Sequence, residues 1–237
     1  MTLDRDIDDL LRDAGDAERA EWEKRYLKSA LTHYGVAVPE VRRAVKRCLA
    51  EADTLTRTEL LGAVRALWSR PIHERRGAAI ELLVARSALL TADDMTLVEQ
   101  LLRESKTWAF VDVLSVHVAG PLVVRLPTLA PTLDRWATDA DFWLRRAAML
   151  TLLLPLRQGG GDFERFARYA DAMLDEQEFF IRKAIGWTLR EVAKRRPALV
   201  VAWLLPRAQR ASGLTFREAT RTLPEAQQRR LKRARER

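Results

Sequence analysis

Apolar residues recur every three to four positions along nearly the whole chain, which is the spacing of an amphipathic helix. No run alternates Val, Ile, Thr and aromatic residues between turn residues, as a strand would. Gly35, Pro39, Pro71 and Pro197 separate the periodic segments and are typical of helix ends. The pattern therefore predicts an all-α protein. We expect helices over residues 16–35, 39–52, 56–70, 73–90, 92–105, 108–120, 141–157, 162–175, 178–196 and 197–210.

One motif recurs at the start of several predicted helices. Residues 142–149 (FWLRRAAM) resemble residues 179–186 (FFIRKAIG), 37 positions later, in the order of their aromatic, basic and small residues. Residues 107–114 (TWAFVDVL) stand one period before 142–149, and residues 72–79 (IHERRGAA) stand two periods before. A period near 36 residues, built from helices alone, predicts a HEAT-like helical-repeat solenoid, an α-α superhelix with a concave surface.

The length and composition bound the protein class. A repeat array of 237 residues is predicted to form a single domain, 1–237, with one substantial core. No apolar run reaches about 18 residues and the first 15 residues are acidic and polar, so we expect no membrane contact and no export signal. The single cysteine, Cys48, excludes an internal disulfide and a thiolate metal cluster. A reducing cytoplasm is the expected compartment.

The net charge of +8 favours a polyanionic partner, but much of it lies at one end of the chain. The last nine residues, RRLKRARER, hold six basic residues and one Glu, so the rest of the chain carries about +3. The basic segment, about residues 225–237, is either a disordered, solvated tail or a contact for nucleic acid. The sequence leaves both open.

Basic pairs recur with the repeat at Arg75–Arg76, Arg145–Arg146 and Arg182–Lys183. Because the register repeats, these pairs should rise in rows along one side of the solenoid. Such rows suit a phosphate backbone and give the predicted concave surface a basic character. The alternative is that they only solvate the surface.

Asp112 breaks the repeated pattern. Aligned on their aromatic residue, the other units carry Gly77, Ala147 and Ala184 where this unit carries a carboxylate. An acidic group at a small-residue position must be hydrogen-bonded, ion-paired or exposed in a cleft. Trp108 lies four residues earlier, on the same helix face. This makes Asp112, with Trp108, the best candidate active site.

The other aromatic and titratable residues carry less information. Trp187 lies four residues after Lys183 and shares its helix face, so we expect it to line the same surface. The three histidines lack ligand spacing and no nucleotide-binding loop follows the glycine run 159–161, so we expect neither metal nor cofactor. The remaining tryptophans are expected in the core: Trp22, Trp68, Trp136, Trp143 and Trp203.

From about residue 20 to 222 the chain resembles the AlkD-like DNA glycosylases of alkylation repair, which are built from HEAT-like repeats. The resemblance rests on four blocks, in this order and spacing. The blocks are Tyr26-x-Lys28 with Tyr34-Gly35-Val36, Pro39 and Arg42; Trp108-x3-Asp112; Trp143-Leu144-Arg145-Arg146-Ala147-Ala148; and Phe180 to Glu191, which includes Arg182, Lys183, Trp187 and Arg190.

The resemblance implies hydrolysis of the N-glycosidic bond of cationic alkylated purines, N3-alkyladenine and N7-alkylguanine, in duplex DNA. Asp112 would be the catalytic carboxylate, Trp108 and Trp187 would flank the lesion, and Tyr26 would complete the cleft. Arg146 would hold phosphate. The protein would act as a cytoplasmic, nucleoid-associated monomer without cofactors. Further DNA contacts are expected from Lys28, Arg145, Arg182, Lys183 and Arg190.

A second class of function remains open, because a repeat fold does not fix an activity. Ala109 stands where the family often has a second Trp, and the basic tail is an addition. A non-catalytic HEAT-like protein that binds nucleic acid or a protein partner is therefore the alternative. The sequence does not give the preferred lesion, whether the base is flipped, or the oligomeric state.

Overall fold

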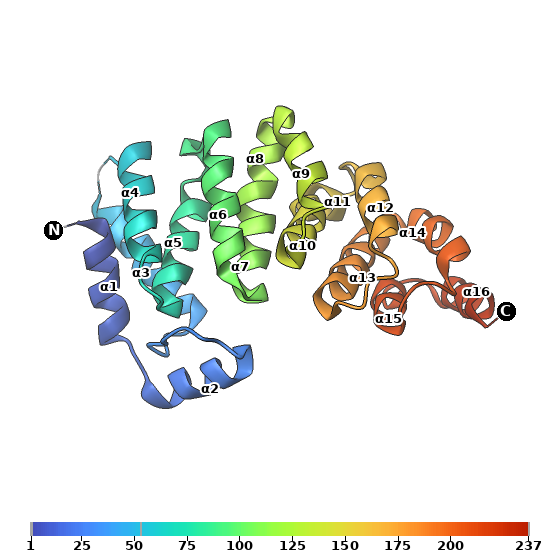
Figure 1. Cartoon of the computed structure of the whole chain (residues 1–237), viewed down its shortest axis with the longest axis horizontal. Helices are drawn as coiled ribbons and strands as arrows, with labels where there is room; N and C mark the ends of the chain where they lie inside the picture. Colours follow the sequence, from blue (N-terminus) through green and yellow to red (C-terminus); the bar gives the residue numbers. More distant parts are fainter. Residues whose placement is uncertain (1, 53, 237) are drawn as a thin grey trace. The chain divides into compact units, whose positions relative to one another are not determined.

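The computed structural model describes residues 2–52 and 54–236 and contains helices throughout (Figure 1). It divides into two compact units, Met1–Leu97 and Val98–Arg237, with the division inside helix α6 (Met95–Ser105). The described residues form no strand, only an isolated bridge between Thr32 and Ile72. The predicted all-α, HEAT-like class is therefore confirmed. The prediction of a single domain stays a prediction.

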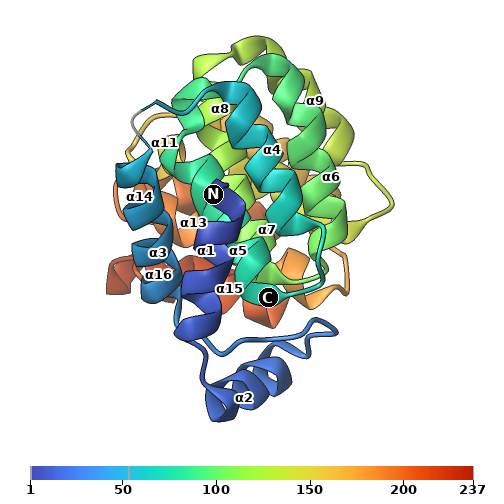
Figure 2. The same cartoon turned by 90° about the vertical axis from the view of Figure 1, so that its left-hand side faces the viewer.

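The first unit is a bundle of four helices with a fifth set apart from them. Helices α1, α3, α4 and α5 pack on one another, whereas α2 lies outside this group (Figure 2). Two short 3₁₀ turns follow α5. The bounds of the helices and turns of this unit are α1 (Leu3–Asp13), α2 (Ala17–Leu27), α3 (Val38–Glu51), α4 (Arg57–Trp68), α5 (His73–Ala85), η1 (Ser87–Leu89) and η2 (Ala92–Asp94).

The second unit is a row of packed helices covered by a further layer. Helices α7, α10, α13 and α15 pack each on the next, and α9, α12 and α14 cover the row (Figure 1). The bounds are α7 (Trp108–Val113), η3 (Leu114–Ala119), α8 (Gly120–Arg125), η4 (Pro127–Leu129), α9 (Ala130–Trp136), α10 (Phe142–Thr151), α11 (Leu153–Arg157), α12 (Phe163–Ala172), α13 (Phe179–Ala193), α14 (Pro197–Leu204), η5 (Leu205–Arg207), α15 (Gly213–Thr220) and α16 (Glu225–Arg235).

The predicted repeat appears as a common starting point for four helices. Helices α5, α7, α10 and α13 begin at His73, Trp108, Phe142 and Phe179, the positions that the repeated motif marks. Side chains fix three of these starts, because Thr107, Asp141 and Glu178 each accept a backbone N–H of the first turn.

Ion pairs join positions that lie one repeat apart. Arg57 pairs with Asp94 at 2.6 Å, 37 residues away in sequence. Arg103 pairs with Asp139 at 2.7 Å and Arg207 pairs with Asp171 at 2.7 Å, each 36 residues apart. Each bond therefore links two positions that lie one repeat length apart.

Several predicted boundaries differ from the structure. The helix expected over residues 16–35 ends at Leu27, because Lys28 adopts a left-handed conformation with φ of 50°. Gly35 also has a positive φ, and a Cβ there would lie 1.9 Å from the carbonyl oxygen of Asp16. Helices α1, α9, α15 and α16 were not predicted. The segment expected as a basic, disordered or solvated tail is helical up to Arg235, and Arg237 lies outside the described residues.

Helices α7, η3 and α8 form one continuous helix from Trp108 to Arg125. It is 18 residues long and apolar enough to cross a membrane by length and composition. The expectation that no apolar run reaches this length was therefore wrong. Asp112 and His117 lie within the segment, but its mean hydropathy is still 1.4 because most of the other residues are apolar. Half of the segment is buried inside the protein, as in the core helix of a repeat.

Candidate functional site

The Asp112 carboxylate is held by a bidentate ion pair. Arg146 donates from Nε to Oδ1 and from Nη2 to Oδ2, both at 2.8 Å, and from Nη1 to the carbonyl oxygen of Phe180 at 2.5 Å. The Arg146 side chain is only 3% exposed, whereas that of Asp112 is 17% exposed. The pair therefore joins α7, α10 and α13, and leaves part of the carboxylate open to solvent. Such fork-to-fork pairing fixes the orientation of the carboxylate.

Trp108 and Asp112 lie on the same short helix, as their spacing predicted. Trp108 is 37% exposed, so its indole reaches solvent rather than the core. The helix then continues into the π-helical segment η3 (Leu114–Ala119). Segments with this wider winding are rare and are often found next to functional sites.

Aromatic rings support the buried side of the Asp112–Arg146 pair. The Arg146 guanidinium lies 5.8 Å from the ring centroid of Phe180. The Phe180 ring lies 4.8 Å from that of Trp143, and Phe142 lies 4.5 Å from Trp143. Because this cluster fills the space around the guanidinium, Arg146 is a positioning residue for Asp112. Its predicted contact with phosphate is untested, and its solvent exposure does not favour such a contact.

Trp187 is half-buried on α13 and makes no ring contact within the part of the chain that the structure describes. The preceding residue, Gly186, lets α13 approach α15 closely. A Cβ at Gly186 would lie 2.6 Å from the Cβ of Glu218 and 3.0 Å from the carbonyl oxygen of Thr215. The role of Trp187 beside a lesion stays a prediction.

The recurring basic pairs are occupied within the chain. Arg75 is buried and pairs with Asp8 at 2.5 Å. The Arg76 guanidinium lies 4.8 Å from the ring of Trp68. Arg145 pairs with Glu176 at 2.8 Å. The predicted rows are thus largely ion-paired side chains rather than free surface charges.

Helix α13 carries three further basic residues that were expected on DNA. Arg182 donates to the carbonyl oxygen of Glu176 at 2.7 Å. Lys183 pairs with Glu218 at 2.7 Å, and Arg190 pairs with the same carboxylate. Burial of Glu218 raises its pKa, but the hydrogen bond from Lys183 and the charge of Arg190 outweigh burial and lower the pKa overall. Their contact with DNA stays a prediction.

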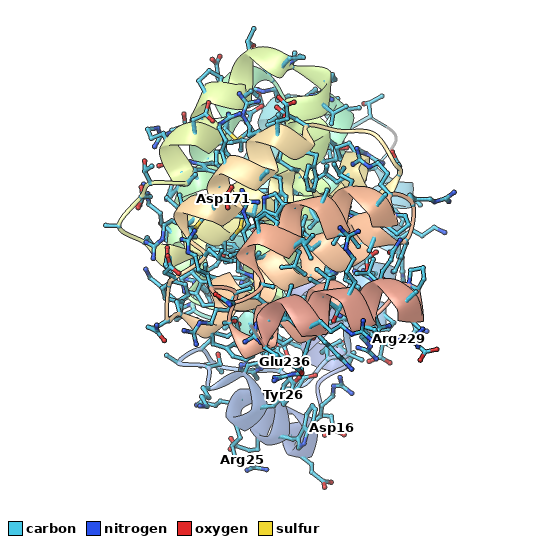
Figure 3. All side chains as sticks on the ribbon, turned by 90° about the vertical axis from the view of Figure 1, so that its right-hand side faces the viewer. Asp16, Arg25, Tyr26, Asp171, Arg229 and Glu236 are labelled. Atoms are coloured by element: carbon cyan, nitrogen blue, oxygen red, sulfur yellow. The ribbon has the colours of Figure 1, made fainter. Side chains whose placement is uncertain are left out.

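The first unit presents an exposed aromatic stack on α2. Tyr26 is 62% exposed and stacks on Trp22, with ring centroids 5.3 Å apart and planes at 4° (Figure 3 labels Tyr26). Lys28, at the end of α2, is also exposed. The prediction that Trp22 lies in the core was wrong, since it is 54% exposed. Its charged neighbours in the sequence EWEKRY were the missed signal. The predicted burial of Trp68, Trp136, Trp143 and Trp203 is confirmed.

One group in the first unit has the residue types of a metal site. One donor atom each from Glu23, His33 and Glu74 lies within 4.8 Å of the others. Within the described part of the chain, neither ring nitrogen of His33 makes a hydrogen bond, and the side chain is fully buried. However, both oxygens of Glu74 already accept backbone N–H groups of residues 34–36. The group therefore has a structural role, and the expected absence of metal is untested.

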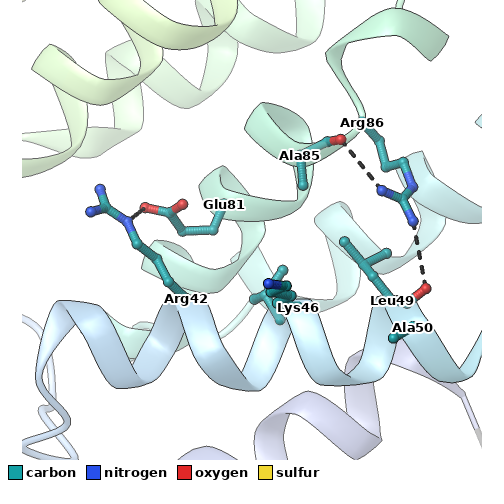
Figure 4. A pocket seen from close by; sticks show the side chains of 8 residues that line it. Arg42, Lys46, Leu49, Ala50, Glu81, Ala85 and Arg86 are labelled. Atoms are coloured by element: carbon teal, nitrogen blue, oxygen red, sulfur yellow. Dashed lines mark hydrogen bonds and ion pairs between the residues drawn. The ribbon is translucent and has the colours of Figure 1, made fainter.

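A small groove also lies between α3 and α5 (Figure 4). Its volume is about 270 Å³. Arg42 at its edge bonds Glu81 at 2.8 Å, and Arg86 donates to the carbonyl oxygens of Ala85 and Leu49 at 3.5 Å. Both guanidinium groups are occupied by the protein, so the groove offers no free cation from these two residues.

The comparison with protein families decides which class these features belong to. The sequence profile described as DNA alkylation repair enzyme matches residues 7–223. The chain belongs to the DNA alkylation repair enzyme family. Family membership supports a role in DNA alkylation repair and implies binding to DNA.

Solved structures share this fold. A predicted DNA alkylation repair enzyme from Enterococcus faecalis is 24% identical, with a TM-score of 0.80, and the match covers 89% of this chain and 97% of that one. AlkD2 from Streptococcus mutans is 15% identical, with a TM-score of 0.64, and the match covers 94% and 99%. No curated protein sequence matches the chain significantly. The two structural matches show the fold of the chain.

Proposed function

We propose that the protein is a monofunctional DNA glycosylase that releases cationic alkylated purines, such as N3-alkyladenine and N7-alkylguanine, from duplex DNA. The observation that supports this most is the oriented, partly exposed Asp112 carboxylate, four residues after the partly exposed Trp108. Arg146 holds the carboxylate in place.

The chemistry needs few groups. A purine alkylated at N3 or N7 already carries a positive charge, so it leaves as a neutral base without a general acid. Positive charge develops on the deoxyribose as the bond breaks. A fixed carboxylate stabilises that charge and orients the attacking water. An exposed indole adds about 0.5 to 2 kcal/mol of cation–π attraction toward a cationic base or sugar.

The exposed stack of Trp22 and Tyr26 suits contact with nucleic acid. Aromatic faces that reach solvent stack on bases or pack on sugars, whereas core aromatics do not. The stack lies in the first unit and Asp112 lies in the second. We therefore assign DNA contact to the stack and the reaction to Asp112.

The test is an assay of base release from duplex DNA that carries several alkyl adducts. The wild type should release methylated purine, and Asp112→Asn should lower the rate by about 100-fold or more, as loss of a group that stabilises transition-state charge does. Binding to the same DNA should change little, because Asn keeps the shape of the side chain. Full release by the Asn variant would contradict the role of Asp112.

The alternative is a non-catalytic protein that binds nucleic acid or a protein partner. It would be supported by a wild type that binds DNA with a steep salt dependence and releases no base from any of the adducts. Indifference to DNA at low salt would instead support a protein partner.

A further inference from the structure

The last helix, α16 (Glu225–Arg235), lies outside the matched residues 7–223 of the family. Its basic residues are therefore not among the positions that define the family match. It is the most basic helix end of the chain, with Lys232, Arg233 and Arg235 in its last turn and Arg229 and Arg230 before them. Only Glu225 and the following Glu236 carry the opposite charge.

The helix is anchored rather than loose. Leu231 is fully buried. Arg235 donates to the carbonyl oxygens of Ala208 and Ala211 at 2.8 and 2.7 Å, and its guanidinium lies 4.8 Å from the ring of Phe216. Because these contacts fix the rotation of α16 about its axis, they also fix which side chains face away from the protein.

The free side of α16 borders a groove of about 490 Å³. Leu205 of η5 forms one wall. The other wall follows one stripe of α16, since its residues recur at helical spacing. That stripe consists of Ala226, Arg229, Arg230, Arg233 and Ala234 (Figure 3 labels Arg229).

Two of the three arginines in the groove are uncompensated. Arg229 pairs with Glu225 on the same helix. Arg230 and Arg233 make no hydrogen bond or ion pair with any residue that the structure describes, and both are exposed. They differ in this from the basic residues of α13, which are engaged within the chain.

A purely structural reason covers only part of this pattern. Basic residues in the last turn of a helix stabilise it through their attraction to the negative end of the helix dipole. This accounts for Lys232 and Arg233 but not for Arg230, which lies in the middle of the helix. The same groove is also lined by the apolar residues Leu205, Ala226 and Ala234, and solubility does not require apolar residues beside the cations.

We propose that the α16 groove binds the phosphodiester backbone of nucleic acid through Arg230 and Arg233, in addition to the surface around Asp112. Planar guanidinium groups match phosphate oxygens with paired N–H donors, and spacing by three residues sets two of them along one stripe. The inference rests on the proposed function only in taking DNA as the ligand. It predicts affinity that is independent of sequence and of damage.

The test compares the salt dependence of binding to undamaged duplex DNA. The double variant Arg230→Gln with Arg233→Gln should lower the slope of log K against log salt by about 1.8, since each phosphate contact contributes about 0.9. The matched control is Arg5→Gln with Arg195→Gln, which removes the same charge from two exposed arginines outside the groove. Thermal melting verifies that both double variants stay folded.

The outcomes separate the two proposals. The groove proposal predicts a lowered slope for the α16 variant alone, with base release at saturating DNA unchanged. Equal slopes for wild type and the α16 variant would overturn it, as would an equal drop in the control, which would indicate a general charge effect. Absence of base release by the wild type would overturn the glycosylase proposal and leave the binding result valid.

Discussion

At the scale of single residues, the Asp112–Arg146 pair connects the candidate chemistry to the stability of the fold. The guanidinium is almost fully buried, and its only described charged partner is the carboxylate. A buried cation that loses its partner, or a carboxylate that loses its cation, is costly. The same bond that orients the candidate catalytic group is thus also a structural link between α7 and α10.

Replacing Arg146 by Ala should therefore affect both stability and rate. We expect the free energy of unfolding to fall by about 3 kcal/mol, because Asp112 is left without its partner. The single-turnover rate of base release should fall while DNA affinity stays nearly constant, since a positioning residue acts through the carboxylate. Arg146→Lys should restore part of the rate.

The neighbouring Arg145 is the matched control. Its pair with Glu176 is more exposed, at 19% and 25%, so Arg145→Ala should cost only about 1 kcal/mol. Chemical unfolding and single-turnover assays measure both effects. A normal rate of base release in folded Arg146→Ala would show that the pair does not position Asp112.

At the scale of helices, the close approach of α13 and α15 depends on a residue without a side chain. Gly186 faces Glu218 and Thr215 at distances that leave no room for a Cβ. The ion pairs of Lys183 and Arg190 with Glu218 therefore lie between two closely packed helices, α13 and α15. The contact holds α13, the helix that carries Trp187.

Gly186→Ala should lower the free energy of unfolding by about 1 to 3 kcal/mol, because the added methyl group forces α15 away from α13. Gly77 is the matched control. It also lies inside a helix, α5, but a Cβ there meets nothing within 4 Å. Gly77→Ala should therefore stabilise the protein by about 0.5 to 1 kcal/mol through better helix propensity. Urea unfolding of both variants tests this, and a loss as large at Gly77 would refute the packing argument.

The elements show what the sequence could predict. Helix starts at Phe142 and Phe179 were predictable, because a repeated motif marks them. The end of α2 at Leu27 was not, since a left-handed Lys28 leaves no periodic signal. The same holds for Arg146: its position in the motif was visible, but its pairing with Asp112 depends on how α7 packs on α10. Helix α16 looks like a charged tail in the sequence, because Leu231 is the single residue of this helix that the structure buries.

At the scale of the whole molecule, charged side chains mainly form ion pairs and hydrogen bonds with other residues of the chain. Glu99 accepts hydrogen bonds from Arg135, Trp136 and Arg103, which outweigh burial and lower its pKa to about 2. The net charge of +8 therefore overstates how many basic side chains outside α16 are exposed and unpaired. Arg230 and Arg233 of α16 differ, because they are exposed and have no partner among the described residues.

Stability should fall as the solution becomes mildly acidic. The rings of His33 and His73 stack with centroids 4.4 Å apart. Burial, and then the charge of His33, lowers the pKa of His73 to about 3, and burial also lowers the pKa of His33. Below about pH 6.5 the unfolded chain binds protons at these rings that the folded chain does not bind. For His73 the free energy of unfolding should drop by about 1 kcal/mol per pH unit over this range, and His33 should act in the same direction.

His73→Gln should flatten this dependence between pH 6.5 and 4.5, because it removes one of the two titrating rings. His117→Gln is the control, since His117 is exposed. Urea unfolding at several pH values measures the slope. A slope for His73→Gln as steep as that of the wild type would show that His73 does not cause the acid sensitivity.

The ion pairs that join residues 36 or 37 positions apart have a consequence for how such a chain changes length. Each pair takes one partner from one unit and one from the next. Duplication of a single unit would copy only one of the two partners, so an Arg would face an Arg, or an Asp an Asp, at the new junction. Duplication of two consecutive units would copy both partners and keep their bond inside the copy. The spacing of the bonds therefore favours growth of the array in steps of two repeats.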